Sequence, residues 1–296
     1  MRILFIGTVL FSKNILDEVI KSKNKIVGVI GKKDTKFNSD YYDLVRYAKR
    51  KKMDSIYTND INSTKTIRWV KKRKPDIILC IGWSQLLKKK ILKITPKGAI
   101  GYHPSDLPQN RGRHPIIWSL VLGLKKIGSC FFYMKTKADT GDIISKKIIK
   151  IKDNFDSNLV YKELVKVGKK QIRGILSRIR FKKLRSSPQK KTISNYWRRR
   201  SELDGKIDWR MDAENINNLV KALTKPYPGA YFFIREKKIR VWKSKVINLD
   251  KKNFEPGKII KFNKNLIIKC GNKALKIITF TPKINFKGVS YLWDQL

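Results

Sequence analysis

Both histidines of the chain lie in one stretch, GYHPSDLPQNRGRHPIIWSLVLG (residues 101–123). His103 is followed by Pro-Ser, by Leu-Pro and by Arg-Gly, a composition typical of a loop that presents its side chains and does not pack them into the core. An imidazole in such a loop is able to take up or deliver a proton near neutral pH. A hydrogen-bonded loop histidine without a catalytic role would fit the same residues, so a catalytic interpretation needs a second group.

An acidic turn, KTKADTGDII (135–144), supplies candidates for that second group. A buried aspartate that accepts from one imidazole nitrogen fixes the tautomer and leaves the other nitrogen free for proton transfer. Asp139 and Asp142 are the candidates, although Thr140-Gly141 also favours a turn or cap role for Asp142. We therefore expect an aspartate of this turn to lie against His103.

The first half of the chain must position these residues, and its pattern is that of an α/β protein. We expect buried strands at 2–7, 25–31 and 75–82 and helices around 14–22, 40–52 and 65–72. This alternation predicts an open, doubly wound parallel sheet. Ligands bind such sheets outside the carboxyl ends of the strands, which makes Gly7-Thr8, Gly31 and Gly82-Trp83 positional candidates. No GxGxxG follows the first strand, so a dinucleotide site is not expected.

The second half of the chain changes character after a long helical pattern at 157–180. We expect a helix at 213–223 and then five short strands, at 229–235, 237–247, 257–262, 266–270 and 274–280. Five strands at close spacing predict a small open β-barrel. The predicted parts are a first domain over 1–185 that carries the candidate site, a basic linker over 186–203 and a C-terminal barrel domain over 204–296.

The charge of the chain is strongly positive, with a formal net charge of +46. Lysine is scattered through almost every segment, which indicates a compositional bias as much as a binding footprint. The densest run, 178–200, holds ten basic residues and no acidic one, and is either a solvated linker or a polyanion-binding patch. A charge of this size predicts attraction to phosphate-bearing partners at low salt, including non-specific polyanion binding.

The remaining composition argues against several classes of protein. Cys80, Cys130 and Cys270 are odd in number and widely spaced, and no CxxC or Cys/His cluster accompanies them. Neither a disulfide framework nor a metal site is therefore expected. No apolar run is long enough to span a membrane and the N-terminus lacks a basic leader, so we expect a cytoplasmic protein with reduced thiols and no membrane partner.

The histidine loop and the acidic turn together resemble the folate-dependent formyltransferases, which include methionyl-tRNA formyltransferase and the N-formyltransferases of nucleotide-linked amino sugars. The hallmark of this family is an Asn-x-His-x-Ser-Leu-Leu-Pro-x-x-Arg-Gly loop, then Pro and Trp, then an Asp-x-Gly turn. The matching residues are His103, Ser105, Leu107-Pro108, Arg111-Gly112, Pro115, Trp118 and Asp139-Thr140-Gly141-Asp142. Further matches are MRILFIGTVLFS at the N-terminus, DGKIDW (204–209), KPYPGAYFF (225–233), IRVWKSKV (239–246) and EPGKII (255–260), so the resemblance covers nearly the whole chain.

The resemblance implies a fold and a mechanism. It implies a Rossmann-like formyltransferase domain, an OB-like barrel domain and a homodimer formed through the C-terminal region. His103 and Asp139 would be catalytic, and the family's Asn would stabilise an oxyanion together with the histidine. This chain has Gly101 at the position of that Asn. Losing one such donor typically costs roughly a hundredfold or more in rate. Three explanations stay open: the amide of Asn110 replaces the donor, the backbone N–H of Gly101 replaces it, or the activity is weakened.

The co-substrate that the resemblance implies is N10-formyltetrahydrofolate, and the chemistry requires no metal. The family cradles the pterin ring at the turn after its central strand. The cofactor-binding residues would therefore be Gly82, Trp83, Ser84 and Gln85, with Asp139. For Trp83 a core aromatic is the alternative.

Segments outside the active-site loop favour an amino sugar as the acceptor. Residues 32–52 resemble the sugar enzymes and lack the long basic Gly-Arg insertion of the tRNA enzymes. Residues 195–209 and 225–233 also resemble the sugar enzymes. The net charge and the basic run favour initiator tRNA instead, and Gly101 motivates a third possibility, a non-catalytic homologue.

The expected acceptor is thus a nucleotide-linked amino sugar, such as a dTDP- or UDP-amino-deoxy sugar. Its diphosphate needs local cations, which Arg111 or Arg113 would supply. Its base would stack on Tyr227, for which a buried structural tyrosine is the alternative. Neither the nucleotide nor the position of the amine on the sugar follows from the sequence.

Overall fold

The computed structural model describes residues 1–33, 39–181, 183–190, 193–249, 253–261, 266–284, 286 and 288–292. The chain forms two compact units. The N-terminal unit comprises 1–115, 127–150 and 162–197, and the C-terminal unit comprises 116–126, 151–161 and 198–296. Two short segments thus belong to the second unit although the chain on both sides of them belongs to the first. The predicted domain limits at 185 and 204 stay predictions.

The N-terminal unit is built on a seven-stranded sheet of order β3-β2-β1-β4-β5-β7-β8. The strands are β1 (Arg2–Ile6), β2 (Lys25–Gly31), β3 (Ser55–Tyr57), β4 (Ile77–Cys80), β5 (Ala99–His103), β7 (Lys126–Tyr133) and β8 (Ile143–Lys150). The first five in spatial order are parallel, whereas β7 runs antiparallel to β5. The three predicted strands are confirmed, and the sheet is mixed where the sequence predicted it to be parallel.

The sheet becomes mixed between β5 and β7. The connection between these two strands contains helix α5 (Pro115–Val121). Ile100 of β5 pairs with Tyr133 of β7, and His103, the last residue of β5, pairs with Cys130. β7 therefore starts at the carboxyl edge of the parallel strands and runs in the opposite direction.

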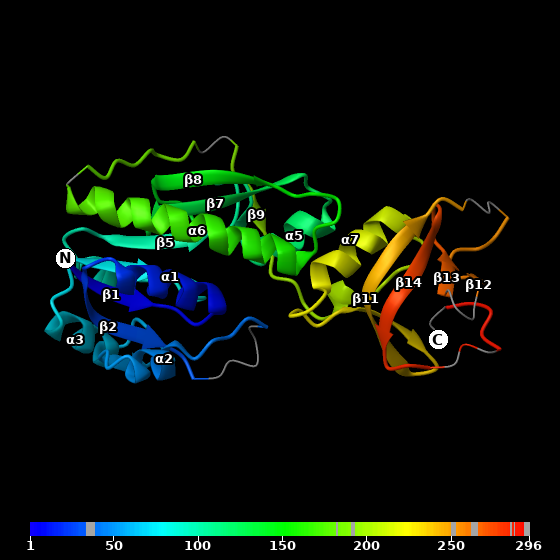
Figure 1. The fold of residues 1–296 in the computed structure, drawn as a ribbon, viewed down its shortest axis with the longest axis horizontal. Coiled ribbons are helices and arrows are strands. Elements are labelled where there is room, and N and C mark those ends of the chain that lie inside the picture. The colour runs from blue at the N-terminus through cyan, green and yellow to red at the C-terminus, as the bar shows by residue number, and fades with distance from the viewer. Residues whose placement is uncertain are drawn as a thin grey trace. The chain divides into compact units, whose positions relative to one another are not determined.

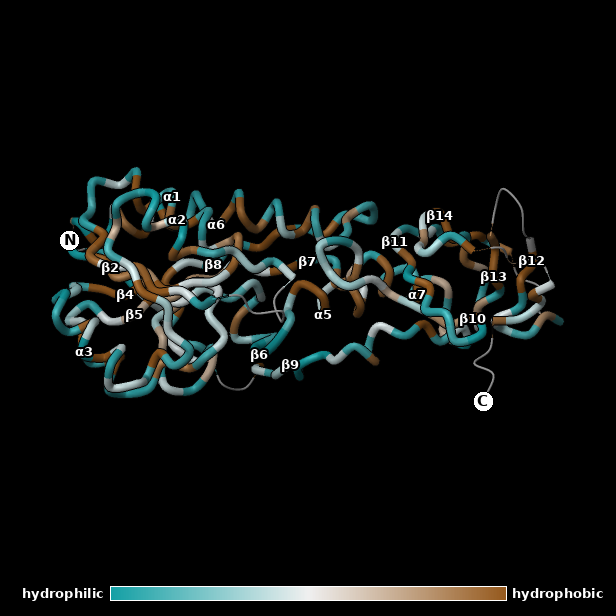
Figure 2. Tube along the Cα trace, turned by 90° about the horizontal axis from the view of Figure 1, so that it is seen from below, coloured by the Kyte–Doolittle hydropathy of each residue, from teal (hydrophilic) through white to brown (hydrophobic). Residues whose placement is uncertain are grey.

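Helices cover both faces of this sheet, as a doubly wound architecture requires. Its helices are α1 (Leu10–Lys21), α2 (Leu44–Arg50), α3 (Thr64–Lys72), α4 (Lys89–Leu92) and α6 (Ser157–Arg180). α1, α2 and α6 lie on one face and α3 lies on the other (Figures 1 and 2). Gly168 of α6 lies against Phe11 of α1, and Trp69 of α3 lies on Gly28 of β2. Because both faces are covered, β1 and β4 are continuous apolar runs.

The C-terminal unit contains an open antiparallel sheet with a helix packed on it. Its order is β10-β11-β14-β13-β12. The strands are β10 (Ala230–Ile234), β11 (Lys237–Ile247), β12 (Ile259–Lys261), β13 (Leu266–Lys269) and β14 (Ala274–Thr281). Helix α7 (Ala213–Leu223) buries Ile216, Leu219 and Val220 and contacts β11. The predicted helix and five strands are confirmed, in the form of a half-barrel.

The three cysteines of the chain are free and buried. Burial raises the pKa of Cys130 and of Cys270 to about 12, so neither thiol is a nucleophile near neutral pH.

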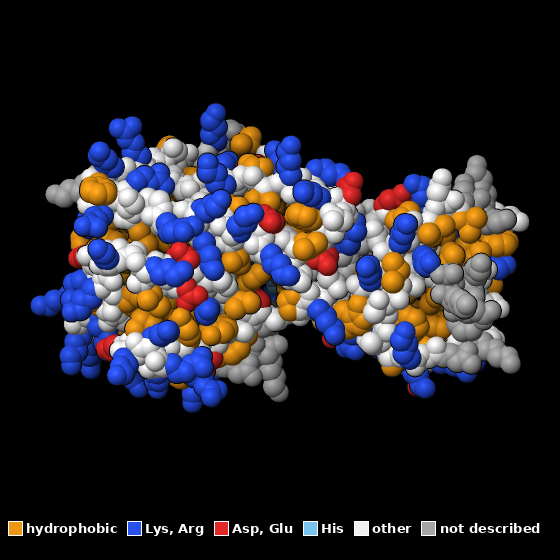
Figure 3. Space-filling view, viewed as in Figure 1, with side chains coloured by type: hydrophobic (Ala, Val, Ile, Leu, Met, Phe, Trp, Pro, Cys, Tyr) orange, Lys and Arg blue, Asp and Glu red, His pale blue; other side chains and the backbone are white. Residues whose placement is uncertain are grey.

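The surface of each unit is basic: Lys and Arg side chains are spread over the face seen in Figure 3. Among the described residues, no helix combines the length and apolar character needed to cross a membrane.

Candidate active site

His103 is the last residue of β5, at the carboxyl edge of the parallel strands, and is only 6% exposed. It pairs with Cys130 of β7, so it belongs to a strand end and not to the exposed loop that the sequence indicated. Its Nε2 lies 3.0 Å from the carbonyl oxygen of Asn110. Because a carbonyl oxygen only accepts, this contact places a proton on Nε2.

Asp139 is the aspartate that faces this imidazole. Its Oδ1 lies 3.8 Å from Nδ1 of His103, which is an ion-pair distance and longer than a hydrogen bond. Its Oδ2 accepts from the backbone N–H of Gly112 at 3.0 Å. Asp142 is bound instead by Lys135, at 2.8 Å. Of the two candidates in the acidic turn, the structure brings Asp139 to the histidine and Asp142 to a surface lysine.

Gly112 lets the histidine loop approach the linker. Its φ is +103°, and a Cβ here would lie 2.3 Å from the carbonyl oxygen of Trp197. Only glycine satisfies both conditions. The Arg-Gly pair forms the short strand β6 (Arg111–Gly112), which pairs parallel with β9 (Tyr196–Trp197).

Gly101, at the position of the family's Asn, lies in the middle of β5. It has neighbours on both sides, Cys80 of β4 and Phe132 of β7, so the sheet takes up its backbone N–H and C=O. A Cβ built on it would lie 3.0 Å from Cγ of Met134 and 3.1 Å from Cζ of Phe132. These two side chains thus crowd the place where the family's amide would begin, on the same face of the strand as His103.

Asn110 has an amide group with spare donor capacity. Its Oδ1 accepts from Nδ2 of Asn195 at 3.1 Å, and its backbone N–H donates to Oδ1 of Asn195 at 2.6 Å. Its own Nδ2 donates to no group in the described part of the chain. Of the three explanations for Gly101, this geometry gives most support to replacement by Asn110.

The turn after β4 is interlocked with the turn after β1. Gly82 has a φ of +63°, and a Cβ on it would lie 2.3 Å from Cγ2 of Val9. Thr8 donates through Oγ1 to the carbonyl oxygen of Gly82 at 2.9 Å. Both turns lie at the carboxyl edge of the sheet, and their role as positional candidates for ligand binding stays a prediction.

The residues after Gly82 have different environments. Trp83 is half-buried against the core, with Nζ of Lys32 5.0 Å from its ring centroid. Its indole N–H is buried and has no hydrogen-bond partner in the part of the chain that the structure describes. Ser84 is exposed. Gln85 accepts from the N–H of Ile61 at 3.2 Å and donates to the carbonyl oxygen of Asn59 at 2.7 Å, so both ends of its amide are engaged.

The three predicted substrate residues are in three different situations. Arg111 is 5% exposed, and its guanidinium donates to Oε1 of Gln189 at 2.7 Å and to the hydroxyl of Tyr196 at 3.3 Å. Arg113 is exposed and donates to the carbonyl oxygen of Ser84 at 3.0 Å, which joins the histidine loop to the turn after β4. Tyr227 is half-buried in the C-terminal unit. Arg113 is therefore the accessible cation of the loop, and Arg111 is an internal one.

Sequence reasoning missed the contribution of the basic linker. Gln189 donates through Nε2 to the carbonyl oxygens of Asp139 and Gly141, at 2.9 and 2.6 Å. Together with Asn195 and Tyr196 it ties the linker to both segments of the candidate site. The signal that was available is the presence of uncharged polar residues, Pro-Gln and Ser-Asn-Tyr-Trp, within an otherwise cationic run.

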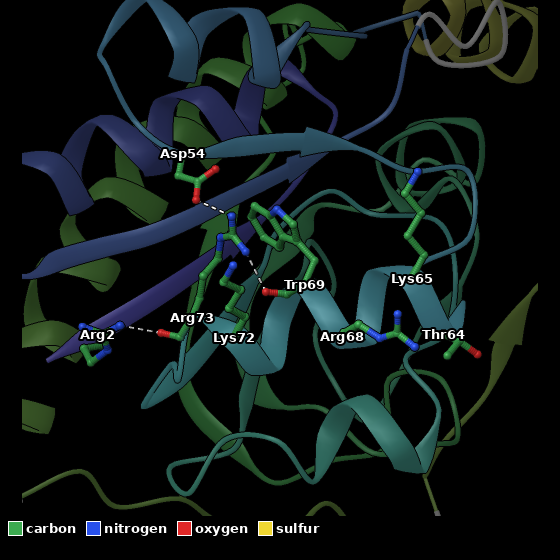
Figure 4. Close-up of a pocket in the computed structure, with 8 residues that line it drawn as sticks. All are labelled: Arg2, Asp54, Thr64, Lys65, Arg68, Trp69, Lys72 and Arg73. Atoms are coloured by element: carbon green, nitrogen blue, oxygen red, sulfur yellow. Dashed lines mark hydrogen bonds and ion pairs between the residues drawn. The ribbon is translucent and has the colours of Figure 1, made fainter.

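A basic pocket of about 1010 Å³ lies elsewhere in the N-terminal unit (Figure 4). Its lining residues are Arg2, Asp54, Thr64, Lys65, Arg68, Trp69, Lys72 and Arg73. The guanidinium of Arg73 lies over the ring of Trp69, 3.3 Å from its centroid, and is paired with Asp54. None of the predicted site residues lines this pocket, so it is separate from the candidate active site.

Comparisons with known proteins agree with the fold and with the motifs. The chain is 38% identical over 228 residues to the bifunctional polymyxin resistance protein ArnA of Wigglesworthia glossinidia brevipalpis, a match that covers 77% of this chain and 34% of ArnA. The chain therefore spans about a third of the length of that relative.

Two solved structures share the fold over nearly the whole chain. One is WlaRD, a sugar 3N-formyl transferase in the presence of dTDP and 5-N-formyl-THF, with a TM-score of 0.71, 19% identity, and coverage of 96% of this chain and 99% of that one. The other is the N-formyltransferase of Helicobacter canadensis with folinic acid and dTDP-3-aminofucose, with a TM-score of 0.69, 18% identity, and coverage of 93% and 98%.

Family profiles match most of the chain. The profile described as formyl transferase matches residues 1–176, and that described as formyl transferase, C-terminal domain, matches residues 200–288. The first match contains His103, Asp139 and the turn at Gly82, and the second contains α7 and all five strands of the C-terminal sheet. The chain belongs to the formyl transferase family of enzymes.

Proposed function

We propose that this chain transfers a formyl group from N10-formyltetrahydrofolate to the primary amine of a nucleotide-linked amino sugar. The observation that carries the proposal is the approach of His103 to Asp139, at 3.8 Å, within the family's own motif at the carboxyl edge of the sheet. The ligands of the two similar structures, a folate with dTDP or with dTDP-3-aminofucose, support the same pair of substrates.

The chemistry asks for a proton acceptor and for donors to a developing oxyanion. N10-formyltetrahydrofolate would supply the formyl carbon: the amine forms a new C–N bond, the C–N10 bond breaks, and N10 gains the proton that the amine loses. The Nε2–H of His103, which lies against the carbonyl oxygen of Asn110 in this structure, would donate to the oxyanion during the reaction. The carboxylate of Asp139 would stabilise the imidazole as it takes up charge during the proton transfers. The amide of Asn110 would be the second donor.

The turn after β4 suits a heteroaromatic ring with hydrogen-bonding edges. Trp83 offers a buried N–H that lacks a partner among the described residues, a situation that costs free energy unless a ligand or water satisfies it. Gly82 brings the backbone close, because no side chain intervenes there. We assign the pterin ring to Gly82, Trp83 and Ser84, and give Gln85 the role of fixing the turn, since its amide is already engaged.

For the acceptor, Arg113 is the residue that would bind a diphosphate. It is exposed, and its guanidinium still has donors available beyond the single bond to Ser84. Arg111 would act indirectly, by fixing the loop. Stacking of a base on Tyr227, a homodimer and a cytoplasmic location remain predictions of the sequence.

The test is an acceptor panel with the purified full chain. dTDP- and UDP-linked amino sugars and charged initiator tRNA are each incubated with N10-formyltetrahydrofolate at two salt concentrations, and the formylated product is measured by mass spectrometry. We expect turnover of an amino sugar with a modest salt dependence. Formylation of the tRNA-bound amino acid with a steep salt dependence, and of no sugar, would support the tRNA alternative. No transfer to any acceptor would support the non-catalytic alternative that Gly101 suggests.

A further inference from the structure

We propose that Gln189 is a positioning residue for formyl transfer, which holds Asp139 opposite His103 without touching either substrate. The inference rests on the proposed function, because Asp139 matters only if the His103–Asp139 pair is catalytic. The linker that carries Gln189 would then be part of the active site and not only a connection between the units.

One side chain joins the histidine loop to the acidic turn. Nε2 of Gln189 donates to the carbonyl oxygens of Asp139 and Gly141, at 2.9 and 2.6 Å. Its Oε1 accepts from Nη2 and Nε of Arg111, at 2.7 and 3.2 Å. Both ends of the amide are therefore used, and each end holds a different segment of the candidate site.

Asp139 needs such support because of its backbone conformation. Its φ is +55°, in the left-handed region that residues with a Cβ occupy only at an energetic cost. Such a conformation persists when the surroundings impose it. Gln189 fixes the carbonyl group of Asp139, and Gly112 fixes its carboxylate through Oδ2 at 3.0 Å. Together these bonds leave Oδ1 directed at His103.

The hydrogen-bond partners of Arg111 also support a positioning role for Gln189. Arg111 is 5% exposed, yet among the described residues it meets only neutral acceptors, Gln189 and the hydroxyl of Tyr196. A buried guanidinium is normally paired with a carboxylate. A neutral amide in this place binds Arg111 and still donates to the acidic turn, which a carboxylate cannot do. The pairing therefore keeps the carboxylate of Asp139 available to His103.

The linker is itself anchored on both sides of Gln189. Ser187 exchanges two backbone hydrogen bonds with Ile143, at 2.7 and 2.8 Å. Asn195 accepts from the N–H of Asn110 at 2.6 Å, and β9 pairs with β6. These contacts hold Gln189 in place, so its two bonds to the acidic turn are not those of a freely moving surface side chain.

The substitution Gln189→Glu keeps the bond to Arg111 and removes the bonds to the acidic turn. Glutamate has the same shape and keeps an acceptor for Arg111, but it replaces the donor by an oxygen that repels the carbonyl groups of Asp139 and Gly141. We expect kcat for the amino-sugar acceptor to fall by about tenfold to a hundredfold, as small misplacements of catalytic groups do, with little change in the KM of either substrate. Gln109→Glu is the matched control: it adds the same charge at an exposed position of the histidine loop, and we expect kcat to change less than twofold.

A double-mutant cycle tests whether the effect passes through Asp139. In an Asp139→Asn background, Gln189→Glu should lower kcat by less than about twofold, because the group that it positions is already lost. A further loss as large as in the wild-type background would overturn the proposal, and so would an equal loss in Gln109→Glu. If Gln189→Glu proves too unstable to assay, Gln189→Met, of similar length and neutral, takes its place in the same cycle.

A measurement without activity distinguishes failure of this inference from failure of the proposed function. The chain has only two histidines, so ¹⁵N-labelled histidine gives one set of imidazole signals for each. We expect the His103 ring signals to shift in Gln189→Glu and to stay unchanged in Gln109→Glu. Shifted signals in a chain that formylates no acceptor would leave the positioning of Asp139 intact and refute the proposed reaction. Unchanged signals would refute the positioning role, whatever the activity.

Discussion

Nε2 of His103 lies 3.0 Å from the backbone carbonyl oxygen of Asn110, so the histidine holds the loop that follows it in the chain. A developing oxyanion would compete with this carbonyl for the same proton. The residue that supports the histidine through its backbone is also the one whose amide Nδ2 is left to donate. The loop 103–110 therefore contains both the donor and a candidate for the second donor that Gly101 cannot provide.

His103→Ala should lower formyl transfer by a hundredfold or more, the range for loss of a general acid–base or an oxyanion donor. Because His103 is buried at a strand end, we also expect a small decrease in melting temperature. His114→Ala, which removes the only other imidazole, is the control and should keep most of the activity. Transfer rates and circular dichroism spectra are measured for both variants. Comparable losses of activity in the two would show that disturbance of the loop, and not loss of the His103 imidazole, lowers the rate.

Asn110→Ala should lower kcat by about tenfold or more if its amide replaces the family's Asn. Asn110→Asp is the companion variant, because it keeps the shape and the acceptor but loses the Nδ2 donor, and it should lose as much. Steady-state rates with a saturating amino sugar measure both. Full activity in Asn110→Asp would exclude the amide of Asn110 as a donor.

Gly101→Asn should destabilise the protein without raising its activity. The backbone there is extended, so a side chain is compatible with φ, but its Cβ would lie 3.0 Å from Met134 and 3.1 Å from Phe132. Overpacking of this kind typically costs about 1–3 kcal/mol. Adding Met134→Ala should relieve the crowding and recover stability, and we expect the double variant to be more active than Gly101→Asn alone. Urea unfolding and kcat test this; a stable, fully active single variant would contradict the crowding.

The two arginines of the loop should respond differently. Arg113→Gln removes an exposed cation, so the KM of the nucleotide-linked sugar should rise by about tenfold, equivalent to one charge-assisted hydrogen bond. Arg111→Gln should instead lower the free energy of unfolding by about 1–3 kcal/mol, because it leaves Gln189 and Tyr196 without their buried partner. Unfolding curves and KM values are measured for both. Equal effects of the two changes on KM would contradict the assignment of Arg113 as the phosphate-binding residue.

Binding of polyanions should depend on the total positive charge of the chain and not on one particular cluster of basic residues. Lys65, Arg68 and Lys72 at the basic pocket have no ion-pair partner among the described residues, and Lys88, Lys89 and Lys90 are equally exposed at another place. Replacing either set by glutamine removes three charges, and we expect both triple variants to elute from heparin at similarly reduced salt. A much larger effect of the pocket set would show that this pocket binds polyanions specifically.

Asp204 should make the C-terminal unit sensitive to acid. Hydrogen bonds from Arg198 hold the pKa of Asp204 well below its usual range, with a contribution from the backbone N–H of Ser201. Since the folded-state pKa is depressed, this stabilisation is complete above the unfolded value of about 4 and is lost as pH falls below it. Asp204→Asn should lower the melting temperature at pH 7 and have a smaller effect at pH 3. Equal effects at the two pH values would contradict the linkage.

The sequence by itself determined the class of fold and the five C-terminal strands, and it predicted that an aspartate of the acidic turn lies against His103. These follow from periodicity and from spacing in a motif, which are local properties of the chain. It also left Asp139 and Asp142 as alternatives. The two residues are three positions apart in one turn, and the sequence does not show which of their side chains faces His103. The contact of Asp142 with Lys135 separates them.

Only the tertiary structure decided what depends on contacts between distant segments. The antiparallel β7, the burial of Arg111 and the crowding beside Gly101 result from contacts between strands and loops that are distant in the chain. Residues adjacent in the sequence give no signal of these contacts. The clearest case is Gln189, which lies 50 residues from Asp139 along the chain and 2.9 Å from its carbonyl oxygen. The composition of a basic run predicts a solvated linker, because it describes the charge of the whole segment. The role of one amide within that run depends on hydrogen-bond geometry, which exists only once the chain has folded.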